Sequence, residues 1–531
     1  MHWIIILLFA TCSAELNIPE LLKNEKHTGA AGVKSRLSPS GINYVASFLT
    51  NSLIMELVTV SLDTAPQKIA TSEGDLTIKD IKLGIHRAPE TIESTLSPPN
   101  SIVIRVKNLN MTANILSEGV FSGQSVLLAS AAQPVFRVIL TKNFRGAPNL
   151  KIEDCKLLQG IPIKSTIQNE KIKSFVEKEA LELLQSLLCS RIEFIVEERI
   201  NARFGLLNPK VPLANINDDV IVNDLIEKMR FARRFKRSSL ISSFNVTKAE
   251  NLALDYTITD VRVTQAGLEI DTFGEVSLRG RGGTYFGPQP ISLPSNAHPD
   301  TMLQMVVSDF VPNSLMYHGH TIGLFNTRIT PSTPHFGPIM KTTCSFSSGT
   351  LFCLGDLFPT LRKLHPNKQL SLVFNTMQAP VIRFQSQNNG GIKFTLLGTI
   401  SIFTMEETNE EKLAAEMSID VSANMKLKLS SSTVRPKISL KTISLKTLSP
   451  KILLQKELDD SVMLAREVLQ RLVNDILREG IPIPVHPLFQ LHKPKVKVME
   501  RALLLQTNFV LNERLLRQLT AADLRKRVIR I

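Results

Sequence analysis

Two neighbouring stretches near the middle of the chain decide the fold. Residues 252–263 read LALDYTITDVRV, and residues 267–278 read GLEIDTFGEVSL. Apolar side chains alternate with polar ones along both stretches, and successive side chains of a strand point to opposite faces of its sheet. This period of two therefore predicts half-buried antiparallel strands, with a turn at residues 265–267 (QAG). We expect a central antiparallel sheet that joins one lobe on either side.

The half of the chain before this sheet combines helices with strands. Residues 39–57 carry apolar side chains at helical spacing, which predicts an amphipathic helix. Alternating segments between residues 76 and 140 predict antiparallel strands, and a slip of the alternation at Lys79 and Asp80 predicts a β-bulge. Residues 171–204 contain no proline and carry a broad apolar stripe. We expect them to form a helix about 50 Å long that lies along the sheet.

The second half of the chain repeats this plan. The period-two pattern predicts strands at residues 371–376, 381–384, 392–403, 417–421, 425–429 and 438–445. A hairpin turn is expected at residues 388–391 (NNGG), and an amphipathic helix from about 457 to 478. In both halves a segment with glycine and proline follows the long helix. We therefore predict an α+β fold of two similar lobes, each a curled antiparallel sheet with long helices.

Length and composition describe a globular protein with more than one core. A chain of 531 residues is too long for a single hydrophobic core, and 43% apolar with 21% charged residues is ordinary for folded domains. The net charge of +14 would suit an anionic partner. We find no nucleic-acid-binding signature in the sequence, so we expect no nucleic-acid partner.

The first residues predict the compartment. Residues 3–11 form a short apolar run, and small residues follow at 12–14. This run is shorter than the roughly 20 apolar residues that span a bilayer, and it has the form of a secretory signal. We expect removal of residues 1–14 and a secreted, extracellular protein.

The cysteines agree with an oxidising compartment. Removal of Cys12 leaves Cys155, Cys189, Cys344 and Cys353, an even number that permits three pairings. Cys344 and Cys353 are close in sequence, so we expect them to form a local disulfide, which leaves Cys155 to pair with Cys189. A zinc site is the alternative, but the sequence has no CxxC spacing.

Three further sites follow from short motifs. Asn110 and Asn245 each begin an N-x-Thr sequence and are predicted glycosylation acceptors in a secreted chain. Residues 234–237 read RFKR, the form that proprotein convertases cut. We expect an uncut surface loop here, with cleavage after Arg237 as the alternative.

Catalytic motifs are absent from the sequence. It contains no Gly-x-Ser-x-Gly elbow, no P-loop and no His-Glu-x-x-His. Residues 280–283 (GRGG) predict a turn, because a dinucleotide-binding loop needs a further glycine and a following helix. His318 and His320 could ligate a metal, but without a third partner we expect ordinary surface residues. We predict no enzymatic activity, no catalytic residues, no cofactor and no metal.

Several stretches in order resemble one family. They are residues 36–44 (RLSPSGINY), the placement of Cys155 and Cys189, LDYT from residue 254, residues 307–314 (VSDFVPNS), 479–484 (EGIPIP) and 503–509 (LLLQTNF). In these the chain resembles the lipid-transfer and lipopolysaccharide-binding proteins. That family includes bactericidal/permeability-increasing protein, lipopolysaccharide-binding protein, phospholipid transfer protein and cholesteryl ester transfer protein. The likeness spans most of the mature chain.

The resemblance implies a boomerang of two barrel-like lobes around a central sheet, with an apolar lipid pocket in each lobe. The predicted divisions are a signal peptide at residues 1–14, an N-terminal lipid-binding lobe at 15–229, a basic linker loop at 230–250, a central sheet segment at 251–280, a C-terminal lipid-binding-like lobe at 281–510 and a basic amphipathic tail at 511–531.

The residues expected near the N-terminal pocket are Ile42, Val45, Phe48, Leu49, Ile172, Phe175, Val176 and Leu183. At about 0.8 kcal/mol per buried CH₂, apolar walls suffice to hold a lipid chain.

Two functions follow from the resemblance. The first is a secreted carrier or exchanger of phospholipids or related amphiphiles. The alternative is an innate-defence protein that binds bacterial lipopolysaccharide or other anionic envelope lipids through basic clusters at residues 230–237 and 525–527. Relatives that capture endotoxin carry lysines at the tip of the N-terminal lobe, whereas the corresponding residues 110–124 contain no Lys or Arg. We therefore prefer the carrier.

Overall fold

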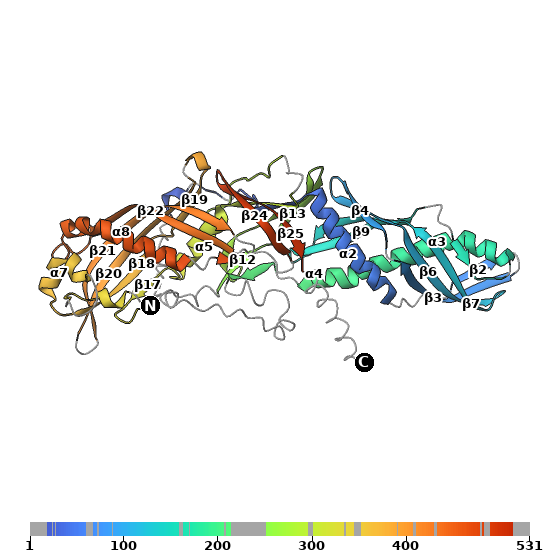
Figure 1. Ribbon diagram of the computed structural model, residues 1–531, viewed down its shortest axis with the longest axis horizontal. Helices are drawn as coiled ribbons and strands as arrows, with labels where there is room; N and C mark the ends of the chain where they lie inside the picture. Colours follow the sequence, from blue (N-terminus) through green and yellow to red (C-terminus); the bar gives the residue numbers. More distant parts are fainter. Residues whose placement is uncertain are drawn as a thin grey trace, which may run out of the picture.

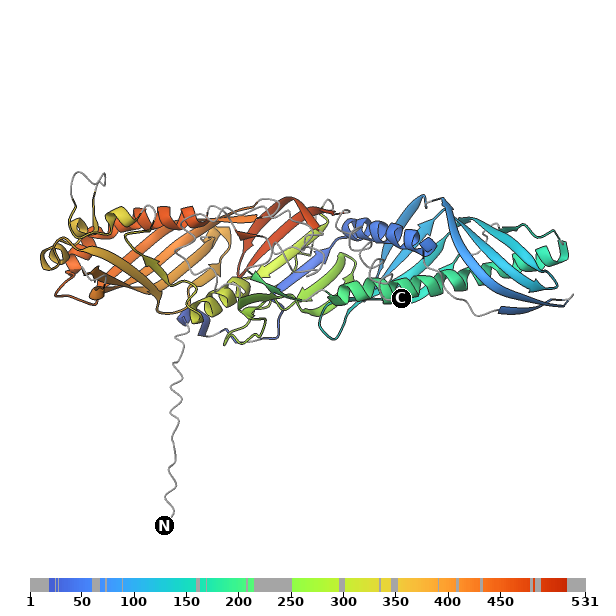
Figure 2. The same cartoon turned by 90° about the horizontal axis from the view of Figure 1, so that it is seen from below.

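The structure is a computed structural model of the whole chain. It describes residues 19–23, 25–26, 28–59, 67–71, 74–87, 89–158, 163–168, 170–206, 209–213, 251–295, 301–333, 336–344, 352–389, 391–406, 410–429, 433–477, 481–482 and 489–512. Figures 1 and 2 show an elongated molecule with one lobe at each end and sheets between them. Strands from the first third of the chain form the N-lobe, and strands after residue 326 form most of the C-lobe.

A six-stranded antiparallel sheet connects the lobes. Its strand order is β13-β14-β1-β16-β25-β24. The strands are β1 (Val33–Leu37), β13 (Ile258–Thr264), β14 (Gly267–Thr272), β16 (Leu303–Ser308), β24 (Phe489–Met499) and β25 (Ala502–Leu511). The predicted hairpin with its turn at residues 265–267 is confirmed as β13 and β14. Strands from both ends of the chain also join this sheet, which the local pattern could not show.

The prediction of one sheet over residues 252–278 is wrong in part. β12 (Leu252–Asp255) and β15 (Val276–Leu278) pair with each other and with β11 (Lys210–Pro212) in a separate three-stranded sheet. The chain leaves β14 through Gly274, whose φ of +75° lies in the left-handed region that favours glycine. This turn sends residues 276–278 to the neighbouring sheet although the alternation continues through it.

The N-lobe contains two antiparallel sheets. One has the order β10-β7-β6-β3-β2 and the other β4-β5-β8-β9. The strands are β2 (Gln67–Thr71), β3 (Gly74–Arg87), β4 (Thr91–Ser97), β5 (Ser101–Lys107), β6 (Leu109–Gly119), β7 (Gly123–Ala132), β8 (Pro134–Lys142), β9 (Pro148–Leu157) and β10 (Ile163–Ser165). The bulge predicted at Lys79 and Asp80 is confirmed, because the register between β3 and β6 shifts between Ile78 and Asp80.

The C-lobe is built on a seven-stranded sheet of order β17-β18-β20-β21-β22-β23, with β19 paired to β20. Its strands are β17 (Thr327–Ile329), β18 (Gln369–Thr376), β19 (Val381–Phe384), β20 (Ile392–Met405), β21 (Glu411–Leu429), β22 (Thr433–Thr447) and β23 (Ile481–Pro482). The hairpin expected at residues 388–391 is confirmed between β19 and β20. None of the described sheets in either lobe closes on itself, so the barrel-like lobes and the boomerang shape stay predictions.

The three predicted long helices are confirmed. They are α2 (Pro39–Thr59), α3 (Glu170–Ile195) and α8 (Gln455–Leu477). α3 continues without a break into the π-helical residues Val196–Asn201 and α4 (Ala202–Leu206), as the stripe over 171–204 predicted. Sequence reasoning missed α5 (Phe310–Thr321). The short helices are α1 (Glu20–Lys23), α6 (Leu354–Leu357), α7 (Pro359–Leu364) and the 3₁₀ turns Gly337–Ile339 and Gln387–Asn389.

Polar side chains of the long helices complete the edges of the N-lobe sheets. β9 is an edge strand, and Asn201 both donates to Leu150 O (2.7 Å) and accepts from Leu150 N (2.8 Å). Glu177 of α3 accepts from Ser165 N of the edge strand β10 at 2.8 Å. Asn43 of α2 accepts from Ser94 N of the edge strand β4 at 3.0 Å. Each helix therefore satisfies backbone groups that an open sheet edge leaves unpaired.

The C-lobe uses the same device. α8 lies along β22, which pairs with β23 only at Thr433 and Val434 (Figure 1). Asn474 accepts from Ile438 N and donates to Ile438 O, both at 2.8 Å. Gln470 accepts from Leu440 N at 2.9 Å. The long helices of both lobes thus follow edge strands because their amides fit the free backbone groups there.

We predict that Asn474→Ala lowers the free energy of unfolding by about 1–3 kcal/mol, because it leaves two backbone groups of β22 without partners. Arg471→Ala is the matched control on the same helix. The Arg471 side chain is largely exposed and its pair with Glu467 is a surface pair, so the change should stay within about 0.5 kcal/mol. Urea unfolding followed by circular dichroism measures both. Equal losses would contradict the assigned role of Asn474.

Candidate functional site

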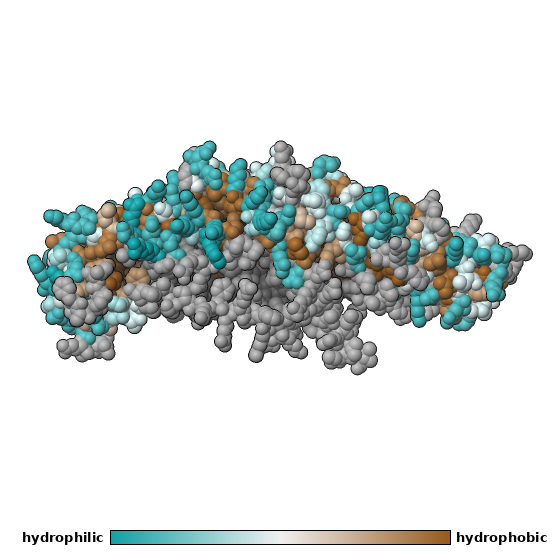
Figure 3. All heavy atoms as spheres, in the orientation of Figure 1, coloured by the Kyte–Doolittle hydropathy of each residue, from teal (hydrophilic) through white to brown (hydrophobic). Residues whose placement is uncertain are grey.

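The apolar interior of the N-lobe is enclosed by two sheets and two helices. α2 packs against β3 and β4, α3 packs against β9 and β10, and the two helices contact each other. We call the buried apolar side chains between them the N-lobe interior. Its helix residues are Ala46, Leu53 and Ile54 of α2, with Leu184, Leu187, Leu188, Ile192, Ile195 and Val196 of the α3 segment. On the face in Figure 3, apolar residues form separate patches among polar ones.

The predicted pocket residues of α2 lie in two different clusters. Ile42 is 5% exposed and packs with Val263 and Leu268 of the central sheet. Val45 and Phe48 pack instead on a cluster around Leu505, Phe509 and their neighbours in β24 and β25. Leu49 is half-buried. The start of α2 thus packs on the central sheet, and its second half enters the N-lobe interior.

The predicted pocket residues of α3 are Ile172, Phe175, Val176 and Leu183. They belong to the helix, but their side chains lie outside the described residues, so their place in a pocket stays a prediction. The described residues that enter the interior come from the later turns of α3, from Leu184 onward. In the sequence, the spacing of three and four residues along these later turns is the signal that marks them.

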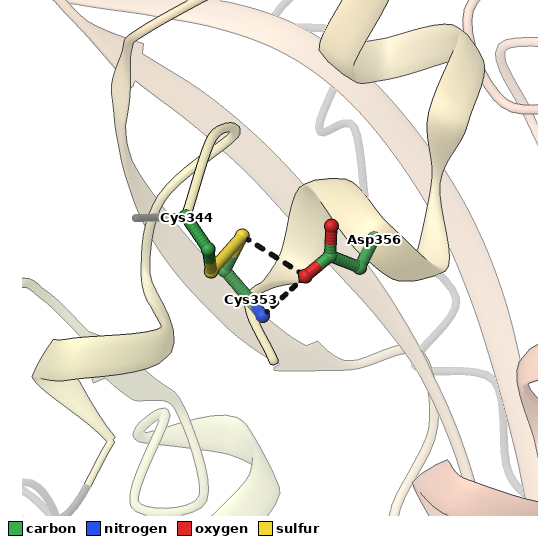
Figure 4. Close-up of side chains that lie close together, drawn as sticks. All are labelled: Cys344, Cys353 and Asp356. Atoms are coloured by element: carbon green, nitrogen blue, oxygen red, sulfur yellow. Dashed lines mark hydrogen bonds between the residues drawn. A yellow bond between two sulfur atoms is a disulfide. The ribbon is translucent and has the colours of Figure 1, made fainter. Parts of the chain in front are cut away.

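Both predicted disulfides are confirmed. Cys155 of β9 is joined to Cys189 of α3, with 5.7 Å between the Cα atoms, so the helix is covalently fixed to the sheet edge that it covers. Cys344 is joined to Cys353. Asp356 accepts a hydrogen bond from Cys353 N at 3.0 Å and caps α6 (Figure 4). These three residues bring possible metal donors together, but the sulfurs are bonded to each other and are not thiolates.

The expectation of a surface residue is wrong for His318, whereas His320 is partly exposed. Both lie on α5. His318 is buried, with Nε2 3.7 Å from Glu275 Oε1. His320 is half-buried, its Nδ1 lies 2.6 Å from Thr376 Oγ1, and burial lowers the pKa of its imidazole. α5 was not predicted, so the burial of its two histidines could not be anticipated.

The remaining predicted sites are the two glycosylation acceptors, the cleavage site and the C-terminal tail. Asn110 is half-buried in β6, where its Oδ1 accepts from Ala131 N at 2.9 Å. Its glycosylation stays a prediction. Asn245, Arg237 and nearly all of the tail at 511–531 lie outside the described residues. The described helices include none that is long and apolar enough to cross a membrane. The domain boundaries also stay predictions, although β16, β24 and most of β25 from the range 281–510 pair in the central sheet.

The motif at residues 307–314 forms a structural junction. Asp309 accepts two hydrogen bonds from Arg501, at 2.7 and 3.0 Å. Asn313 donates to Ile382 O and accepts from Ile382 N, both at 2.8 Å. Ser314 accepts from Val276 N at 2.9 Å. These contacts tie the central sheets to β19 of the C-lobe and explain the motif without a ligand.

A ladder of charges crosses one face of the central sheet. Arg262, Glu269, Arg36 and Gln304 stand on four adjacent strands, and each contacts the next. Arg36 donates to Glu269 Oε1 at 2.6 and 2.9 Å and to Gln304 Oε1 at 3.2 Å. Arg262 donates to Glu269 Oε2 at 3.2 Å. Burial opposes ionisation of Glu269, but the hydrogen bonds and charges of Arg36 and Arg262 lower the pKa of its carboxyl.

Comparison with known proteins identifies the family of this chain. The sequence model of the "LBP / BPI / CETP family, C-terminal domain" matches residues 247–511. The chain belongs to this family. The N-lobe lies outside the matched range. A search of curated proteins finds no match for the sequence.

One solved structure shows a similar fold over nearly the whole chain. The crystal structure of lipopolysaccharide binding protein superposes with a TM-score of 0.50 at 15% sequence identity, covering 91% of this chain and 99% of that chain. Takeout 1 of Epiphyas postvittana matches 29% of this chain and 94% of that chain, at 12% identity and a TM-score of 0.21. The second likeness is too slight to support an inference. The family fold implies lipid binding in general and does not name the lipid.

We predict that Glu269→Gln lowers the free energy of unfolding by about 3 kcal/mol at neutral pH, because it leaves the buried Arg36 without its charged partner. The folded-state pKa of Glu269 is lowered, so its stabilisation is present above the unfolded-state value and is lost as pH falls. The difference from wild type should therefore shrink at about pH 3.5.

Glu118→Gln is the control for this test, because the pair of Glu118 with Lys79 is exposed. It should cost less than about 1 kcal/mol. Chemical unfolding of both variants at the two pH values gives the comparison. A Glu269→Gln variant as stable as Glu118→Gln at neutral pH would show that the ladder is not a stabilising feature.

Proposed function

We propose that the chain is a secreted, non-enzymatic lipid-binding protein that holds phospholipid-like amphiphiles between the helices and sheets of its lobes. One observation carries this proposal. The N-lobe interior is lined by apolar side chains from both sheets and both helices, and its walls are two open sheets joined through helices instead of one closed barrel. Such an enclosure can admit a hydrocarbon chain by a shift of α2, without breaking a strand pairing or the disulfide that fixes α3 to β9. The two disulfides agree with a secreted protein.

The described surface favours a carrier over a module that captures endotoxin. The β6–β7 hairpin provides no Lys or Arg, and Lys79 on the neighbouring β3 is paired with Glu118 at 2.6 Å. The basic runs at residues 230–237 and 525–527 lie outside the described residues. Binding of anionic envelope lipids is therefore the alternative function.

We predict that the purified protein carries bound phospholipid-like molecules, which native mass spectrometry and organic extraction will identify. It should also move a fluorescent phosphatidylcholine between vesicles. Protein that is empty and inactive in transfer, but that binds lipopolysaccharide in a salt-sensitive way, would replace the carrier with the defence function. Protein that does neither would contradict both.

A pair of filling mutations locates the lipid. Ala129 of β7 is fully buried in the N-lobe interior, whereas Ala502 of β25 is buried in a separate cluster on the central sheet. Ala129→Phe should lose the N-lobe lipid and stay folded, because the ring takes the space of the lipid chain. Ala502→Phe should keep the lipid and lose about 1–3 kcal/mol of stability by overpacking. Full lipid occupancy in Ala129→Phe would place the ligand elsewhere.

A further inference from the structure

A charged residue stands on the buried stripe of α3. Arg191 follows Leu184, Leu187 and Leu188 and precedes Ile195 at the spacing of three and four residues that keeps one helix face together. It is 5% exposed, as deeply buried as the apolar residues beside it. The acidic residues of the same segment, Glu193, Glu197 and Glu198, are exposed instead. A cation therefore lies within the helix face that forms the N-lobe interior.

Arg191 has no partner in the described part of the chain. Its Nε is buried without a hydrogen bond, and no described carboxylate lies within 4.0 Å of its guanidinium. The other buried arginine of the described residues, Arg36, is fully paired with Glu269 and Gln304. The fold thus pairs one buried arginine completely and leaves the second without an anion.

An unpaired buried cation is unfavourable, because the guanidinium loses its hydration and gains nothing in return. Burial accordingly lowers the pKa of Arg191. The aliphatic part of an arginine can pack on apolar surface, but then its head normally reaches water. Here Nε is enclosed without a hydrogen bond, and only 5% of the residue is exposed. The position is also held firmly, because the Cys155–Cys189 disulfide fixes α3 to β9 two residues away.

We propose that Arg191 binds the anionic head of an amphiphile whose hydrocarbon chain lies in the N-lobe interior. This inference rests on the proposed lipid-binding function and adds the class of head group. A guanidinium presents two parallel N–H groups that match the two oxygens of a carboxylate or a phosphate. The ligand is therefore a fatty acid or an amphiphile with a phosphate head, and it supplies the charge that the chain does not.

The test uses the delipidated full-length protein and three ligands with similar chains: oleate, oleyl alcohol and oleyl phosphate. We expect wild type to bind the two anions at least about tenfold more tightly than the alcohol, from charge-assisted hydrogen bonds to Arg191. Arg191→Met should remove this preference and leave the affinity for oleyl alcohol unchanged. It should also raise the melting temperature of the empty protein, since the unpaired buried charge is gone.

Arg105→Met is the matched control, because Arg105 is exposed on β5 of the same lobe. It should keep the full preference for anions, and Arg191→Lys should keep only part of it. The order of oleate and oleyl phosphate tells a fatty acid from a phosphate head, and either order supports the proposal.

The results that would overturn the inference differ from those that would overturn the proposed function. Equal binding of oleate and oleyl alcohol by wild type, or an undiminished preference in Arg191→Met, refutes the role of Arg191 while lipid binding stands. If Arg191→Met does not fold, Arg191→Lys takes its place, and an undiminished preference for anions in that variant refutes the role of Arg191. If wild type binds none of the three ligands and does not bind phosphatidylcholine, lipid binding itself is refuted.

Discussion

The structure depends on how the edges of its open sheets are satisfied. A sheet that does not close leaves a row of backbone groups without partners, and these must reach water, another strand or a side chain. Here side chains of the long helices take that place. Asn201 holds Leu150 in the N-lobe, and Asn474 holds Ile438 in the C-lobe with the same two-bond geometry. The helices are therefore part of the walls and do not simply lie on a finished sheet.

In this arrangement, apolar side chains and paired polar side chains are buried in different parts of the molecule. The N-lobe interior takes apolar residues from both sheets and both helices, and the paired charges are gathered in the central region, where the ladder through Arg36 and the Asp309–Arg501 pair join distant segments. Rigid polar contacts thus fix the junction of the lobes. The lobe interior is left with few directional contacts, which suits a ligand with a flexible hydrocarbon chain. Arg191 is the exception, and its exposed acidic neighbours do not offset it.

Much of this fold could be predicted from local patterns. The alternation at residues 258–272 predicted the hairpin, and the slip at Lys79 predicted the bulge. The predicted bounds of the three long helices lie close to the observed ones. The placement of β1 between β14 and β16, and of β25 beside β16, could not be predicted, because pairing between segments so far apart in the chain leaves no periodic signal. The positions of the predicted pocket residues of α2 could not be foreseen for a related reason. An apolar stripe shows that a helix is buried, but not that Ile42 faces the central sheet while Leu188 enters the lobe.

The most direct measurement is an experimental density map of the protein purified with its native lipid. If the helices close a lipid-binding enclosure, continuous tubular density that no side chain explains will lie between α2, α3 and the two N-lobe sheets, with its head near Arg191. If protein side chains fill that interior completely and no such density is present, the enclosure is an ordinary core and the lipid-binding account of the N-lobe is contradicted.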